Sequence, residues 1–128
     1  MNIVTFNGYK VSEIILKNKN ESNTIFDLEN KYSYKVNYLS DNKTCIGKLI
    51  IEITDKKVTD QFLIKVELSG FFNYKEDVSK ENINVETFKE LFPYVRVLIT
   101  TLTTNAGMPP LVIPSVDFDE QSVNIQKS

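Results

Sequence analysis

Apolar residues recur at every second position through most of the first two-thirds of the chain. Segments 4–16, 32–38, 49–53 and 62–74 show this alternation, which is typical of β-strands that bury one face. Asn7-Gly8 interrupts the first segment and predicts a bulge or bend. Because the segments follow one another through polar turns, the pattern predicts a four-stranded antiparallel sheet with one face in water.

The second segment is rich in tyrosine. Tyr32, Tyr34 and Tyr38 fall on one face of the predicted strand, and we expect their rings to pack on the sheet with the hydroxyls in water. The connection before this strand is polar over residues 18–23 and then carries Ile25-Phe26, two apolar residues that look exposed. This connection is therefore of interest as a surface as well as a link.

The final third of the chain changes period. Between Phe88 and Leu102 apolar residues recur at spacings of three and four, the stripe of an amphipathic helix. Two starts fit: an N-cap at Asn84, or a start near Leu91 with Pro93 in the first turn, where proline is tolerated. Gly107 predicts the end of the helix.

These patterns predict an α+β fold in which a long C-terminal helix packs on one face of a four-stranded antiparallel sheet. We expect a single domain over residues 1–118. The remaining residues, 119–128, are mostly polar and predict a tail or a short second helix.

Composition removes several classes of function. Fifteen basic and 17 acidic residues give a net charge of −2, so no basic field attracts nucleic acid. The absence of histidine removes the commonest general base and most zinc sites, and we expect no catalytic residues, no metal and no cofactor. The single Cys45 fits a reducing compartment. No signal peptide or apolar run of about 20 residues is visible, which predicts a cytoplasmic protein without membrane insertion.

The segment after the helix carries the strongest functional signal. Residues 108–118 are apolar and rich in proline, and they hold no charge before Asp117. A soluble protein leaves such a loop at its surface only if the loop covers a core or receives a partner. For Leu111 and Ile113 the sequence leaves both roles open.

Several stretches resemble the SecB protein-export chaperones. Leu91-Phe92-Pro93-Tyr94 followed by the loop over 108–118 is similar to the family's helix start and helix-connecting loop. Ile25-Phe26, followed by Tyr34-Lys35-Val36, is similar to its crossover between strands one and two, and residues 62–72 are similar to its fourth strand. The resemblance covers nearly the whole chain and implies the SecB fold, assembled as a homotetramer that is a dimer of dimers.

The resemblance also implies a function. SecB proteins hold unfolded preproteins in apolar grooves without ATP and pass them to the translocase motor SecA. By this likeness the client-binding groove is formed by residues of the crossover and of the helix-connecting loop, namely Ile25, Phe26, Leu28, Met108, Leu111, Val112 and Ile113. Methionine and aromatic side chains adapt to varied partners, which suits broad recognition.

The family's docking face for SecA is altered here. The matching positions are Glu13, which keeps its acidic charge, Leu63, which keeps its apolar contact, and Lys17 and Lys65, which reverse the charge. Two lysines in an acidic patch repel a basic partner, so we expect only weak binding to SecA.

Two other functions remain open, and a third is disfavoured. Some SecB-like proteins are chaperones for the antitoxin of a toxin–antitoxin system, and this sequence fits that role as well as it fits export. A non-catalytic oligomeric adaptor with one fixed partner is a further alternative. A small enzyme is disfavoured, because no carboxylate is paired with a nucleophile at a telling spacing and no glycine loop is present to bind phosphate.

Overall fold

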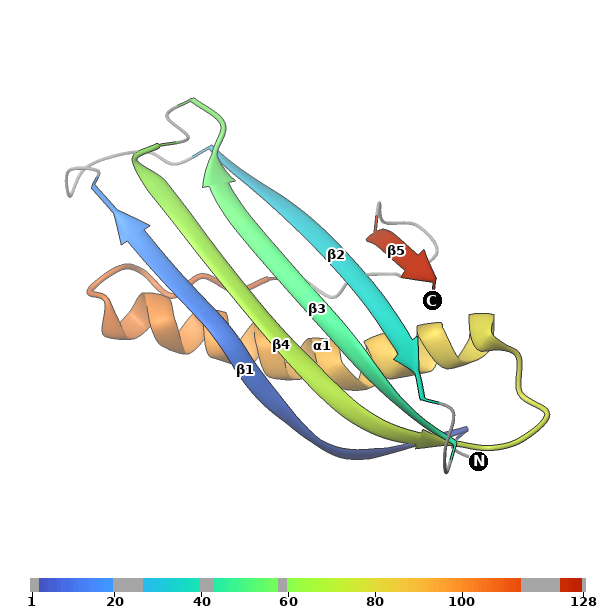
Figure 1. The fold of residues 1–128 in the computed structure, drawn as a ribbon. Helices are drawn as coiled ribbons and strands as arrows, with labels where there is room; N and C mark the ends of the chain where they lie inside the picture. The colour runs from blue at the N-terminus through green and yellow to red at the C-terminus, as the bar shows by residue number, and fades with distance from the viewer. Residues whose placement is uncertain (1–2, 20–26, 40–42, 58–59, 114–122, 128) are drawn as a thin grey trace.

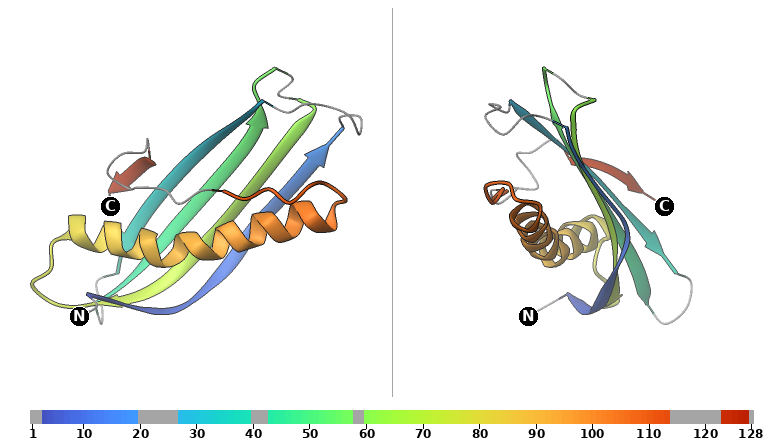
Figure 2. Two further views of the ribbon diagram at one scale, coloured as in Figure 1. Left: turned by 180° about the vertical axis from the view of Figure 1, so that it is seen from behind. Right: turned by 90° about the vertical axis from the view of Figure 1, so that its left-hand side faces the viewer.

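A five-stranded sheet with one long helix on one face makes up the fold (Figures 1 and 2). The computed structural model describes residues 3–19, 27–39, 43–57, 60–113 and 123–127. The elements run in the order β1 (Val4–Asn18), β2 (Leu28–Tyr38), β3 (Thr44–Asp55), β4 (Phe62–Tyr74), α1 (Lys80–Asn105) and β5 (Val123–Lys127). The first four strands pair antiparallel, as the sequence predicted. Their order is β1-β4-β3-β2, so the connection after β1 crosses to the far edge of this four-stranded part.

The predicted interruption of the first strand is a β-bulge. The register of β1 against β4 shifts between Phe6 and Gly8, and again between Val11 and Glu13. Gly8 has a φ of +128°, a region that residues with a side chain rarely adopt. The bulge is therefore placed where the chain supplies a glycine.

The core lies between α1 and the sheet face that it covers. Alternate side chains of β3 and β4 are buried on this face, and the buried stripe of α1 packs against them. A Cβ atom added to Gly70 would lie 3.0 Å from Leu91 Cδ1 and 2.8 Å from Phe72 Cε2, so glycine is needed where the helix approaches β4. The largest enclosed side chains come from both layers and include Tyr34, Phe62, Phe72, Phe88, Leu49 and Leu91.

Both predicted starts of the helix are wrong. The helix begins at Lys80 and is capped by Ser79, whose Oγ accepts the N–H of Asn82 at 3.2 Å. Pro93 therefore lies in the middle of α1. Proline has no N–H to donate to the carbonyl of Lys89, four residues earlier. Pro93 and Lys89 are both exposed, so this carbonyl lies on the water-facing side of the helix and the proline is tolerated.

The expectation that the β2 tyrosine hydroxyls lie in water is wrong for Tyr34 and Tyr38. The Tyr34 hydroxyl is enclosed and donates to Thr87 Oγ1 at 2.6 Å. The Tyr38 hydroxyl bonds the side-chain oxygen of Asn84, a buried residue of α1. Burial raises the pKa of both phenols. The hydroxyls find helix partners because α1 crosses directly over the inner face of β2.

The described part of the C-terminal segment is a strand and not a helix. Val123–Lys127 pairs in parallel with Tyr32–Val36 of β2 and extends the sheet at that edge. Val123 and Ile125 stand two positions apart, which is the period of a strand, and β2 supplies an open edge. The expected domain boundary at residue 118 lies outside the described residues.

Candidate functional site

The loop after α1 runs back along the helix and is bonded to it by side chains. Gly107, with a φ of +79°, turns the chain, and Met108–Ile113 then follows α1 toward β2 (Figure 2). Arg96 Nε donates to the carbonyl of Ile113 at 2.8 Å, and Thr100 Oγ1 donates to the carbonyl of Leu111 at 2.8 Å. Because these donors are four residues apart, they share one face of the helix.

Thr103 completes this row of contacts. Its Oγ1 accepts the backbone N–H of Leu111 at 2.9 Å, while the hydroxyl donates to carbonyls of the preceding helical turn at 3.0–3.1 Å. The Thr103 side chain is completely buried. Three backbone groups of the loop, the N–H and C=O of Leu111 and the C=O of Ile113, are thus bonded to side chains of α1, which fixes the loop beside the helix.

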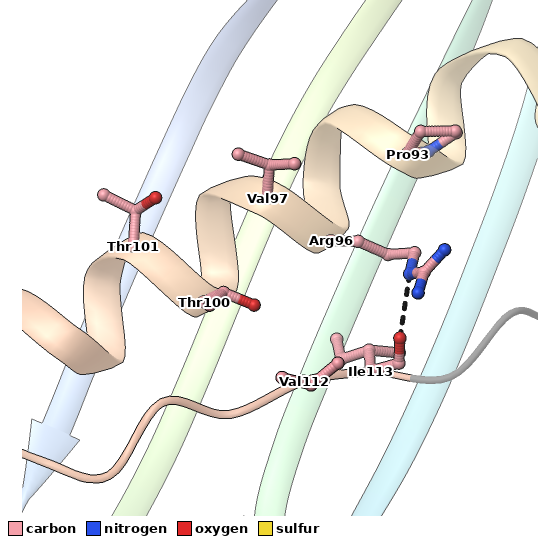
Figure 3. Close-up of a pocket in the computed structure, with 7 residues that line it drawn as sticks. All are labelled: Pro93, Arg96, Val97, Thr100, Thr101, Val112 and Ile113. Atoms are coloured by element: carbon pink, nitrogen blue, oxygen red, sulfur yellow. Dashed lines mark hydrogen bonds between the residues drawn. The ribbon is translucent and has the colours of Figure 1, made fainter.

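A shallow apolar depression of about 450 Å³ lies between the exposed face of α1 and this loop (Figure 3). Val97 on the helix and Val112 on the loop are each 66% exposed. Arg96 is the one charged residue of the lining, and Figure 3 shows its guanidinium turned toward the Ile113 carbonyl. The lining consists of Pro93, Arg96, Val97, Thr100, Thr101, Val112 and Ile113.

The predicted groove residues of the loop have different environments. Val112 faces outward, whereas Ile113 is 2% exposed and belongs to the core. Met108 and Leu111 are partly buried and pack against that core. The sequence left core and surface roles open for Leu111 and Ile113, and the structure places the Ile113 side chain in the core.

Of the three crossover residues predicted to line the groove, the structure describes only Leu28. Leu28 is the first residue of β2, is partly buried against the core, and does not line the depression. Ile25 and Phe26 lie outside the described residues. The predicted pairing of crossover and loop side chains therefore stays a prediction.

Sequence reasoning missed the helix side of the depression. It assigned the stripe from Phe88 to Leu102 to the core or a subunit interface, and it gave Pro93, Val97 and Thr101 no place in the groove. A signal was present, because residues 91–105 contain a single charged residue, Arg96. An exposed helix face is usually charged, so an uncharged one indicates a surface that receives a partner.

The four residues of the predicted docking face lie together on the side of the sheet away from α1. Lys17 and Leu63 are register partners of β1 and β4. Lys65 Nζ lies 3.0 Å from Glu13 Oε1, and this hydrogen bond and charge raise the pKa of Lys65. The one acidic residue kept at these positions is therefore paired with one of the two lysines.

A second acidic residue on this face is held in the same way. Ser12 Oγ donates to Glu67 Oε2 at 2.7 Å, and Lys48 Nζ lies 3.6 Å from Glu67 Oε1. The hydrogen bond from Ser12 and the charge of Lys48 lower the pKa of Glu67. The face consequently presents paired charges and no run of unpaired carboxylates at these positions.

The described ranges contain neither a membrane-spanning helix nor a metal-binding cluster. In that part of the chain no helix is long and apolar enough to cross a membrane. Within the same residues no three His, Cys, Asp or Glu side chains are grouped so that they could hold a metal ion. That the chain has no catalytic activity and binds no cofactor stays a prediction.

Comparison with known proteins identifies the family. The sequence profile of the family described as "Preprotein translocase subunit SecB" matches residues 12–126. The chain belongs to the SecB family. This match includes all of α1 and the loop after it, so the SecB likeness predicted from the sequence is confirmed.

Curated relatives agree with this assignment. The protein-export protein SecB of Orientia tsutsugamushi is 28% identical over 91% of this chain and 79% of its own length. The SecB of Neorickettsia sennetsu is 32% identical over 59% of this chain and 50% of its own, and an uncharacterized protein of Methanocaldococcus jannaschii is 36% identical over 50% and 43%. The chain thus spans about half the length of the latter two relatives or less.

A solved structure shows the same fold. The SecB-like chaperone of Mycobacterium tuberculosis, in complex with a peptide from an antitoxin, matches with a TM-score of 0.72 over 89% of this chain and 88% of that chain. Sequence identity is 13%, so this likeness concerns the fold alone. The predicted four-stranded antiparallel sheet with a long C-terminal helix is the fold of a SecB-like chaperone.

Proposed function

We propose that this SecB-family protein is an ATP-independent holdase that captures unfolded polypeptide segments in the cytoplasm. The observation that carries the proposal is the depression between α1 and its following loop, where Val97 and Val112 face solvent and Arg96 is the one charged lining residue. An unfolded client offers scattered apolar side chains and no fixed shape. A shallow apolar surface on a fixed backbone suits such a partner, because it makes few directional demands.

We infer that the binding surface extends from this depression toward the crossover. The predicted groove residues Met108 and Leu111 continue the loop on one side, and Leu28 begins the strand that follows Ile25-Phe26. Each client side chain that is fully buried in such a groove contributes about 1.5–3 kcal/mol. Several such contacts together give useful affinity with little specificity for the sequence of the client.

Two kinds of client fit the proposal. The first is an exported preprotein, as the names of the curated SecB relatives suggest. The second is an antitoxin, which is favoured by the fold match to a SecB-like chaperone that was solved with an antitoxin peptide. An adaptor with one fixed partner is a third possibility, and binding to several unrelated unfolded proteins would argue against it.

We propose that this protein binds SecA weakly and therefore transfers clients to it inefficiently. The Glu13 carboxylate is paired with Lys65, and Lys17 adds a positive charge two register pairs along from Lys65. A basic partner approaching this face therefore meets lysines where the family presents acidic side chains. The capture of clients does not depend on this face.

We propose a homotetramer, arranged as a dimer of dimers, as the working assembly. Tyr9 on β1 and Tyr94 on α1 are both more than 40% exposed, and their ring centroids lie 4.9 Å apart, which gives an apolar strip that does not line the client depression. Monomeric proteins rarely leave such strips open. A 14.7 kDa species in light scattering at micromolar concentration would rule out the tetramer.

Suppression of aggregation tests the proposed capture site. Val112→Asp places a charge in the depression, and Leu39→Asp, at a position that is 45% exposed after β2, is the matched control. We expect Val112→Asp to lose suppression and Leu39→Asp to keep it, with both variants retaining the thermal unfolding of the parent and its mass in light scattering. Equal suppression by all three proteins would contradict the proposed site.

A further inference from the structure

The C-terminal strand occupies the sheet edge at β2, the strand whose first residue, Leu28, belongs to the proposed client groove. β5 pairs in parallel with β2 in the register Tyr32↔Val123 to Val36↔Lys127 (Figure 1). It pairs with five of the eleven residues of β2, and Leu28–Lys31 at the start of β2 have no register partner in β5. The chain end therefore uses the backbone groups of the central part of this edge.

The edge of β2 has the chemistry that an extended client needs. Unpaired N–H and C=O groups along an edge strand bind another extended backbone without reading its sequence. Leu28, a residue of the proposed groove, is the first residue of this strand. A client that extends along the proposed groove to Leu28 would meet this strand edge, and β5 already fills part of it.

β5 is held less firmly than the strands of the core sheet. It makes five register pairs with β2, whereas β2 and β3 make eleven and are antiparallel. A parallel pair is slightly less stable per residue than an antiparallel pair, and β5 has a neighbour on one side only. Its release does not open the core, because α1 and the four antiparallel strands enclose the buried side chains.

We propose that β5 is an intramolecular competitor that occupies the β2 edge until an extended client segment displaces it. This inference rests on the proposed holdase function and adds a means of regulating the same site. A tethered strand has a high effective concentration at its edge, so even weak pairing reduces client affinity. If the edge is open in about one molecule in ten, the apparent affinity falls about tenfold.

Two variants with opposite expected effects test the proposal. A chain that ends at Ser122 lacks β5 and leaves the β2 edge open. A second variant carries Ser33→Cys and Asn124→Cys, which are register partners, in a Cys45→Ala background. Neighbouring strands lie about 4.8 Å apart, within the range that a disulfide spans, so oxidation fixes β5 on the edge.

The probe is reduced and carboxymethylated α-lactalbumin, an unfolded chain, labelled with a fluorophore for anisotropy titration. We expect the truncated chain to bind about tenfold more tightly than the full chain, and the oxidised double-cysteine variant to bind at least tenfold more weakly and to recover on reduction. Thermal unfolding of the truncated chain, followed by circular dichroism, checks that the remaining sheet and helix stay folded.

The outcomes separate the inference from the proposed function. If the full chain binds the probe but truncation and oxidation leave affinity unchanged, the inference is wrong and the holdase function stands. If the disulfide does not form in the folded protein, β5 is not seated beside β2 and the inference is also wrong. If neither the full nor the truncated chain binds the probe, the proposed function falls and the inference falls with it.

Discussion

Thr103 and Leu111 are joined by a hydrogen bond of 2.9 Å from the Leu111 backbone N–H to the threonine hydroxyl oxygen. Thr103 is completely buried in α1, and Leu111 lies in the loop that returns along this helix. With the contacts from Arg96 and Thr100, this bond holds the loop backbone at a fixed place beside the helix. The apolar depression exists because the loop is held there.

Replacing Thr103 by valine tests this relationship. Thr103→Val keeps the shape of the side chain but removes the acceptor for the Leu111 N–H, and we expect the free energy of unfolding to fall by about 1–3 kcal/mol. Hydrogen exchange of the Leu111 amide should become faster. Thr104→Val is the matched control, because Thr104 is exposed and its hydroxyl bonds only a helix carbonyl. Unchanged protection of Leu111 in Thr103→Val would show that the loop is held by other contacts.

Gly47 and Tyr34 test the packing between β3 and β2. A Cβ atom at Gly47 would collide with the Tyr34 hydroxyl, which is enclosed against Thr87. We expect Gly47→Ala to lower the free energy of unfolding by about 1–3 kcal/mol. In a Tyr34→Phe background the same substitution should cost less, because the hydroxyl is gone. A double-mutant cycle measured by urea unfolding gives the coupling, and a coupling near zero would contradict the predicted collision.

Cys45 is expected to be unreactive in the folded protein. Burial raises the pKa of its thiol to about 11, so the thiol stays protonated at pH 8 and reacts slowly with thiol reagents. Labelling should become fast in denaturant. Rapid labelling of the native protein at pH 8 would mean that the strand carrying Cys45 opens readily.

The same pKa shift predicts a loss of stability at high pH. The pKa of the thiol is about 8.5 in the unfolded chain and about 11 in the folded chain, so the folded chain keeps this proton to a higher pH. The unfolded state therefore binds fewer protons in this window, and the free energy of unfolding falls as the pH rises through it. Cys45→Ala should flatten this dependence in urea titrations. An equally steep fall in the variant would assign the effect to other groups, such as the buried tyrosines.

Charge reversal on the outer sheet face tests the proposed weakness of SecA binding. Lys17→Glu together with Lys65→Glu replaces two positive charges by negative ones beside Glu13, and we expect affinity for SecA to rise several-fold at low salt. Lys35→Glu on β2 is the control for a general charge effect. Isothermal titration calorimetry gives the affinities, and tight binding by the unmodified chain would contradict the proposal.

The sheet was predictable because its signals are local. A period of two fixes which side chains of β1 to β4 share a face, and the glycine at position 8 marks the bulge that the register shows. The start near Leu91 was wrong because Pro93 was read as a boundary, whereas its exposed position lets the helix continue through it. The start at Asn84 was wrong because its side chain bonds Tyr38 inside the helix, while Ser79 caps the helix five residues earlier.

The site was less predictable because it depends on contacts between distant residues. The partners of Tyr34 and Tyr38 are 53 and 46 residues away along the chain, and no local pattern shows that α1 crosses over them. The apolar loop was recognised, but Val112 and Ile113 have opposite environments that neighbouring positions do not reveal. The helix side of the depression was recognisable only from the lack of charge over residues 91–105.

Site-specific photocrosslinking at Val112 tests the central claim most directly. A photoreactive benzoylphenylalanine at position 112 is placed in the depression, and the same residue at position 39 is the control on a comparable exposed surface. With an unfolded client in micromolar excess, we predict a crosslinked client at position 112 and none at position 39. Equal crosslinking at both positions, or none at position 112, would contradict the assignment of this depression as the place where clients bind.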